Sequence, residues 1–259
     1  MNTKIQSLIL SFSYFVGLEF LILKQEILKP TDIFQIIFFL ILVILGEIFW
    51  LYFLTSFKKI NFLTISKIIF IVLFTAESSI FIFLFKNFFW QQILIILFSI
   101  LFYFIFWAFA QSTRHSFLAF NVFVVAAFLL AFFNFTIIFN FFLSGKFSES
   151  LVHFITFLSV LSFYLFLFFL HFEIKTHLFF ELWVLVLIFW EIFLTLSFLP
   201  LNQFILSVVL VLFLYIIWIF MLAFFENRIN KNVIIECVVF VIISILVVLK
   251  FIPWKSFLM

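Results

Sequence analysis

Residues 88–110 read FFWQQILIILFSILFYFIFWAFA, and this stretch decides the fold class of the chain. It runs for more than twenty residues without a charged side chain, and apolar residues fill all of it rather than one helical stripe. About 20 helical residues of this kind cross the hydrocarbon of a bilayer, which is about 30 Å thick. A strand of a transmembrane β-barrel would be about ten residues long and would alternate apolar with polar side chains. The stretch therefore predicts a transmembrane α-helix.

Eight further stretches of the same kind lie before and after it. They cover residues 5–23, 33–57, 62–85, 116–143, 151–172, 178–199, 203–225 and 233–252. Because the connections are short, consecutive helices are expected to be antiparallel neighbours. The sequence thus predicts an all-α fold, a polytopic transmembrane helical bundle of about nine spans that forms a single domain over residues 1–259. An eight-span alternative stays open, because only Lys86 and Asn87 separate the third stretch from the fourth.

The composition of the whole chain agrees with this fold class. Hydrophobic residues make up 69% of the chain and charged residues 10%, whereas soluble domains have about 45–50% and about 25%. A soluble fold would have too few polar residues to cover its surface. The chain also has 53 phenylalanines, which the codons of an AT-rich genome favour. We therefore expect a bacterial cytoplasmic membrane as the location and the lipid bilayer as a partner.

The basic residues give little information about orientation or partners. The net charge is +3, and Lys and Arg are scattered over the short loops of both faces in nearly equal numbers. An excess of Lys and Arg in the loops of one face would set the orientation in the membrane, so the orientation stays open. No basic stripe is present, so a nucleic-acid partner is not expected.

Two matching words suggest an internal repeat. The second stretch contains GEIFW from Gly46, and the seventh contains WEIFL from Trp190. Aligning them relates a unit of residues 1–110 to a unit of residues 148–259, with 111–147 as a connecting span. Because the two words lie five spans apart, the two units would have opposite orientations, as in inverted-repeat transporters. The alternative is chance, since matches among Phe, Ile and Leu are frequent in so biased a sequence.

Four glutamates within the predicted spans are the candidate binding residues: Glu19, Glu47, Glu77 and Glu191. A charge at the centre of a bilayer costs at least about 2.5–3.5 kcal/mol, so an ionisable residue there is a functional candidate by default. With few basic residues nearby, these carboxyl groups must be protonated, share protons or hold a cation. Each state would suit proton or ion binding by a coupled carrier. The alternative is that protonated glutamates form hydrogen bonds between helices and fix their packing.

Two other polar residues are interpreted as structural. Gln91 and Gln92, beside Trp90 at the end of a predicted span, are interpreted as anchors at the membrane interface.

Histidines and a glutamate in HFEIKTH, residues 171–177, together with His153, do not have the spacing of a zinc site. Cys237 is the single cysteine, so no thiol cluster can form. No cofactor and no metal site are expected.

These patterns leave three functions open. Proton- or cation-coupled transport of a small solute explains the glutamates and the repeat. A non-catalytic membrane scaffold, assembly factor or subunit of a membrane complex explains the short loops and the lack of motifs. A membrane-embedded enzyme is the least favoured, because the chain has no nucleophile motif and no set of metal ligands.

Overall fold

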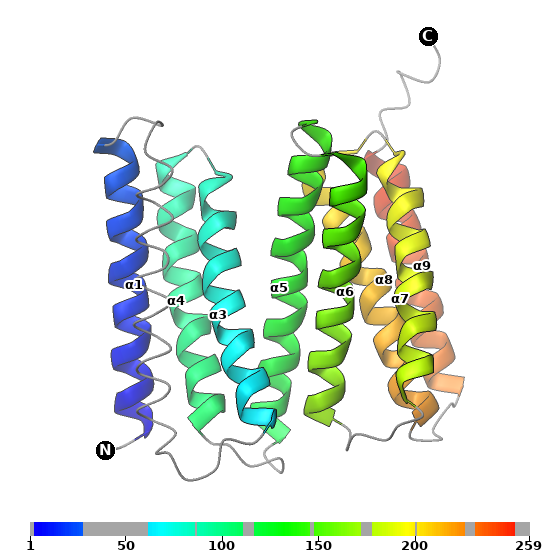
Figure 1. Ribbon diagram of the computed structural model, residues 1–259, viewed down its shortest axis with the longest axis horizontal. Helices are drawn as coiled ribbons and strands as arrows, with labels where there is room; N and C mark the ends of the chain where they lie inside the picture. The colour runs from blue at the N-terminus through cyan, green and yellow to red at the C-terminus, as the bar shows by residue number, and fades with distance from the viewer. Residues whose placement is uncertain are drawn as a thin grey trace. The chain divides into compact units, whose positions relative to one another are not determined.

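The computed structural model describes residues 3–27, 62–85, 87–110, 117–145, 148–171, 178–199, 201–225 and 231–251. In these ranges every regular element is an α-helix, as Figure 1 shows. The helices are α1 (Thr3–Ile27), α3 (Phe62–Phe83), α4 (Phe88–Ala110), α5 (Phe117–Leu143), α6 (Glu149–His171), α7 (Leu178–Ser197), α8 (Gln203–Phe225) and α9 (Lys231–Phe251). The all-α prediction is therefore confirmed for the described part of the chain.

Each of these helices coincides with one predicted stretch. The stretch 33–57, which includes Glu47, lies outside the described residues. Between α3 and α4 the backbone turns, with hydrogen bonds from the Leu84 amide to the Phe81 carbonyl and from the Phe85 amide to the Ile82 carbonyl, both 3.1 Å. The third and fourth stretches are therefore two separate helices, and merging them into one is excluded.

Within the described residues, four helices are long and apolar enough to cross a membrane, judged by length and composition: α4, α5, α8 and α9. The described parts of α1, α3, α6 and α7 contain shorter apolar stretches, Ser7–Glu19, Ile68–Phe83, Leu151–Leu167 and Val184–Ser197. These properties are those of a chain that associates with a membrane.

Particular residues set the helix ends. The side-chain oxygen of Asn87 accepts a hydrogen bond from the Phe89 amide at 2.9 Å, and that of Asn202 accepts one from the Phe204 amide at 3.0 Å. Each asparagine thus satisfies an amide that the first turn of a helix leaves without a partner. Gly145 follows α5 with a φ of +64°, a left-handed conformation in which glycine avoids the strain of a Cβ atom.

The chain divides into two compact units. Unit 1 comprises residues 1–130 and 166–172, and unit 2 comprises residues 131–165 and 173–259. The division falls within α5 and α6, so each of these helices contributes to both units.

Aromatic rings fill the core of unit 1. Tyr14 of α1 stacks on Phe102 of α4 with ring centroids 4.1 Å apart, and Phe70 of α3 stacks on Phe166 of α6 at 4.2 Å. Such pairs contribute about 0.5–1.5 kcal/mol beyond their buried area. In Figure 1, α1 lies beside α4, and α3 also contacts α4.

In unit 2, aromatic pairs connect α5 with α7, and α9 packs on α8. Phe135 stacks on Phe189 at 5.5 Å, and Phe139 stacks on Phe193 at 5.0 Å. The α8 helix contacts both α7 and α9. Ser244 is the buried residue of α9, whose other described side chains are half-buried or exposed.

Candidate functional site

One predicted glutamate, Glu19, makes a side-chain contact between helices in unit 1. Gln92 of α4 donates a hydrogen bond from Nε2 to Glu19 Oε2 at 3.1 Å, and Glu19 is half-buried. Gln92 is close to the start of α4 at Phe88, about 6 Å along the helix axis. The contact is therefore near the start of α4, whereas on α1 Glu19 lies nearer to the middle of the helix than to its end at Ile27. Its partner is a neutral amide, which supplies a donor but no opposite charge.

A second polar contact joins α1 to α3. The hydroxyl groups of Tyr14 and Ser78 are 2.6 Å apart, and both residues are buried. Ser78 also donates to the Phe74 carbonyl at 2.5 Å. Because a serine hydroxyl has a single hydrogen, Tyr14 is the donor in its contact with Ser78. The contact fixes α1 against α3 one residue from Glu77.

The middle of α3 carries polar side chains at consecutive turns. Thr75 and Ser79 are buried and donate to the carbonyls of Ile71 and Thr75, four residues earlier, at 3.0 and 2.6 Å. Because these hydroxyl groups donate their hydrogens to the helix backbone, they can act only as acceptors toward any other group. Glu77 lies between them in sequence, half-buried, with its Oε2 atom buried.

We call these residues of unit 1 the polar zone: Tyr14, Glu19, Thr75, Glu77, Ser78, Ser79 and Gln92. The structure thus brings two of the four predicted glutamates, Glu19 and Glu77, into one unit. The other residues of the polar zone carry hydroxyl and amide oxygens, and the Gln92 amide donates a hydrogen bond to Glu19.

Glu191 has a different environment. It is exposed on α7 in unit 2, in a stripe whose other exposed members have helical spacing. The stripe consists of Val184, Leu187, Ile188, Glu191, Thr195 and Phe198. The Thr195 hydroxyl donates to the Glu191 carbonyl at 2.9 Å, so it is used within the helix. The predicted pairing of Glu191 with Glu47 stays a prediction, because Glu47 lies outside the described residues.

The two glutamines have roles that the sequence interpretation missed. Gln91 is buried and donates to the Phe85 carbonyl at 2.7 Å, which fastens the turn before α4. Gln92 reaches Glu19 instead. The sequence feature that could have predicted this contact is an amide in a span without charges, which can donate to a carboxyl group on a neighbouring helix.

The histidines form no metal centre in the part of the chain that the structure describes. His153 of α6 is half-buried, with ring centroids 6.3 Å from Trp190 and 5.9 Å from Phe193. The side chains of His171, Glu173 and His177 lie outside the described residues. Among the described residues, no three His, Cys, Asp or Glu side chains come together as metal ligands.

The polar zone is therefore the candidate site. A carboxyl group beside a neutral amide donor can accept a proton or hold a small cation, and hydroxyl oxygens are among the ligands that cations use. The zone contains no motif for covalent catalysis. The chain matches no protein-family model, no curated protein and no solved structure.

Proposed function

We propose that this chain is an integral membrane carrier that couples the movement of a small solute to protons or cations. The observation that supports the proposal most is the contact between Glu19 and Gln92, in which a half-buried carboxyl group of one apolar helix accepts a hydrogen bond from the neutral amide of another. Inserting an ionisable residue into a membrane helix costs free energy, and residues of this kind usually have a function.

The contact has two states that a carrier can use. In the structure Gln92 Nε2 donates to Glu19 Oε2, and an ionised carboxylate can only accept in this contact. A protonated Glu19 is also a donor, and it can donate to the amide oxygen of Gln92. Binding of one proton or one small cation therefore changes the contact between α1 and α4. A ligand shifts a conformational equilibrium when it interacts differently with two states, and this contact supplies such a difference.

The whole chain would cross a bacterial cytoplasmic membrane nine times. Residues 1–110 and 148–259 would form units of opposite orientation around the connecting span 111–147. Inverted repeats of this kind carry their sites at the interface of the two units. Glu47 and Glu191, at the centres of the matching words, would then form a second pair of proton or ion ligands.

A specific observation favours a second function, that of a scaffold or subunit in a membrane complex. Glu191 lies in the exposed apolar stripe of α7. A carboxyl group that faces lipid near the bilayer centre costs about 2.5–3.5 kcal/mol, by analogy with aspartate. A partner helix with a donor opposite Glu191 would remove that cost. Recovery of a stoichiometric partner from mild detergent would favour this function, and repeated recovery of the chain alone would disfavour it.

Transport can be tested with purified protein in vesicles that enclose a pH-sensitive dye. A mixture of amino acids, sugars and small organic cations is added outside, and proton movement and solute uptake are recorded. We expect Glu19→Gln to leave insertion and folding intact and to abolish proton-coupled uptake, because an amide cannot take up a proton.

The matched control is Glu236→Gln, which changes an exposed glutamate of α9 and should keep full uptake. Uptake that is unchanged in both Glu19→Gln and Glu77→Gln would contradict the proposal. So would a wild-type protein that moves none of the solutes.

A further inference from the structure

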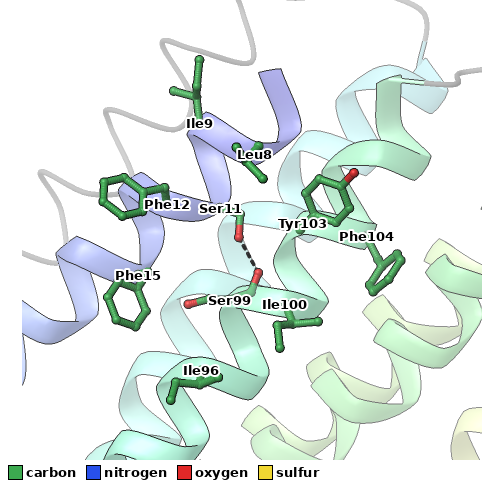
Figure 2. A pocket seen from close by; sticks show the side chains of 10 residues that line it. All are labelled: Leu8, Ile9, Ser11, Phe12, Phe15, Ile96, Ser99, Ile100, Tyr103 and Phe104. Carbon is green, nitrogen blue, oxygen red and sulfur yellow. Dashed lines mark hydrogen bonds between the residues drawn. The ribbon is translucent and has the colours of Figure 1, made fainter. Parts of the chain in front are cut away.

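A groove of about 620 Å³ lies between α1 and α4. Its lining comes from both helices, as Figure 2 shows: Leu8, Ile9, Ser11, Phe12, Phe15, Ile96, Ser99, Ile100, Tyr103 and Phe104. Binding sites for small molecules have about 300–1,000 Å³ and mostly apolar walls with a few polar groups. The groove therefore has the size and character of a site for one small, mainly apolar molecule.

The polar group at the bottom of this groove is the hydroxyl of Ser99. Ser99 is only 7% exposed, and its Oγ atom is buried without a hydrogen-bond partner. In Figure 2 its side chain lies between Phe15 of α1 and Ile100 of α4. A buried polar atom without a partner is uncommon and calls for an explanation, for which a ligand is one.

Other serines show that this state is not imposed by the helix. Ser79, Ser207 and Ser244 each donate to the carbonyl four residues earlier, at distances of 2.6 to 2.8 Å. Rotation about one bond would allow Ser99 the same contact. In the structure, however, the Ser99 hydroxyl does not use its backbone in this way.

Ser11, the other serine in the lining, already has a partner. Its hydroxyl donates to the Ser99 carbonyl at 2.5 Å, which holds α1 against α4. Apart from the two serines and Tyr103, the lining residues are apolar. Leu8 and Phe12 are 62% and 65% exposed. A charged ligand would find no opposite charge among the lining residues.

We propose that the groove between α1 and α4 binds a membrane-soluble small molecule whose uncharged acceptor oxygen, an ether or a carbonyl, receives the hydrogen bond of Ser99. The molecule enters sideways from the apolar surroundings, past Leu8 and Phe12. This site is separate from the Glu19–Gln92 contact, and its occupancy does not depend on transport.

Photolabelling with benzophenone, an apolar ketone that cross-links to nearby C–H bonds, tests the site in phosphatidylcholine vesicles containing the full chain. We expect the cross-links to map to α1 and α4. Two competitors that differ by one group then report on the hydrogen bond: dibenzyl ether has an oxygen where 1,3-diphenylpropane has a methylene. At equal membrane concentration, the ether should compete about three- to tenfold better, as expected for one net hydrogen bond.

The preference for the ether should fall to about one in Ser99→Ala and persist in Ser162→Ala, which changes an exposed serine of α6. Ile100→Trp fills the groove at an exposed position and should abolish the labelling. Cross-links that lie outside α1 and α4 would overturn the proposal. A preference for the ether that Ser99→Ala leaves unchanged would also overturn it, whatever the result of the transport assay.

Discussion

Most hydroxyl groups in the described helices satisfy their own backbone, and a few polar side chains join neighbouring helices. Three of the joining residues belong to α1: Ser11, Tyr14 and Glu19. They connect α1 to α3 and α4. An interhelical hydrogen bond between membrane helices contributes about 0.6 kcal/mol on average. The three contacts therefore contribute little to the stability of unit 1, and their main effect is to fix the position of α1 relative to α3 and α4.

Tyr14→Phe tests the contact between α1 and α3. The change removes the hydroxyl that donates to Ser78 but keeps the ring that stacks on Phe102. We expect the free energy of unfolding to fall by about 0.5–1.5 kcal/mol, the net value of one buried hydrogen bond. Reversible unfolding in mixed micelles measures it. The matched control is Tyr103→Phe on α4, at a half-buried tyrosine, where a change above a few tenths of a kcal/mol would contradict the assignment.

At the scale of residues, the sequence identifies carboxyl groups better than it identifies their partners. Glu19 and Glu77 stand out because a charge is rare in an apolar stretch. Gln92 does not stand out, since an amide beside Trp90 at a helix start fits an interfacial anchor equally well. The pairing of Gln92 with Glu19 depends on α1 lying beside α4, a long-range contact that no local pattern encodes.

At the scale of elements, hydropathy and helix punctuation together locate the helices closely. The α4 and α8 helices begin directly after the capping residues Asn87 and Asn202. The largest difference is at α1, which ends at Ile27 although the apolar stretch ends at residue 23. Lys, Gln and Glu are good helix formers, so charged residues end the apolar stretch without ending the helix.

Ser244 is the buried residue among the described side chains of α9, the helix that packs on α8. It is 1% exposed, and its hydroxyl donates to the Phe240 carbonyl of its own helix. Its value to the contact is therefore its small size, which lets membrane helices approach closely. We expect Ser244→Leu to destabilise the protein by about 1–3 kcal/mol through overpacking, measured by unfolding in mixed micelles.

Two variants separate overpacking from other effects at this position. Ser244→Ala keeps the small volume and should be close to neutral. Ile243→Leu changes an exposed neighbour and should also be close to neutral. Equal destabilisation by Ser244→Ala and Ser244→Leu would show that the hydroxyl, rather than its size, is what the contact requires.

At the scale of the whole molecule, the positions of the described helices agree with the predicted stretches, but the number of membrane crossings is a separate question. Length and composition qualify α4, α5, α8 and α9 as candidate spans. The proposed nine crossings also require α1, α3, α6, α7 and residues 33–57. Parity distinguishes the alternatives, because an odd number of crossings leaves the two ends of the chain on opposite sides and an even number leaves them on one side.

Cysteine labelling can decide this parity, since Cys237 is the single cysteine of the chain. In a Cys237→Ser background, Asn2→Cys and Leu258→Cys place one thiol near either end. If the chain crosses nine times, a membrane-impermeant maleimide added to sealed vesicles of uniform orientation labels one variant, and the other reacts only after the vesicles are permeabilised. The near balance of Lys and Arg between the two faces does not decide which variant reacts first. Labelling of both variants in sealed vesicles, or of neither, would instead require an even number of crossings, and the inverted repeat around residues 111–147 would fail with it.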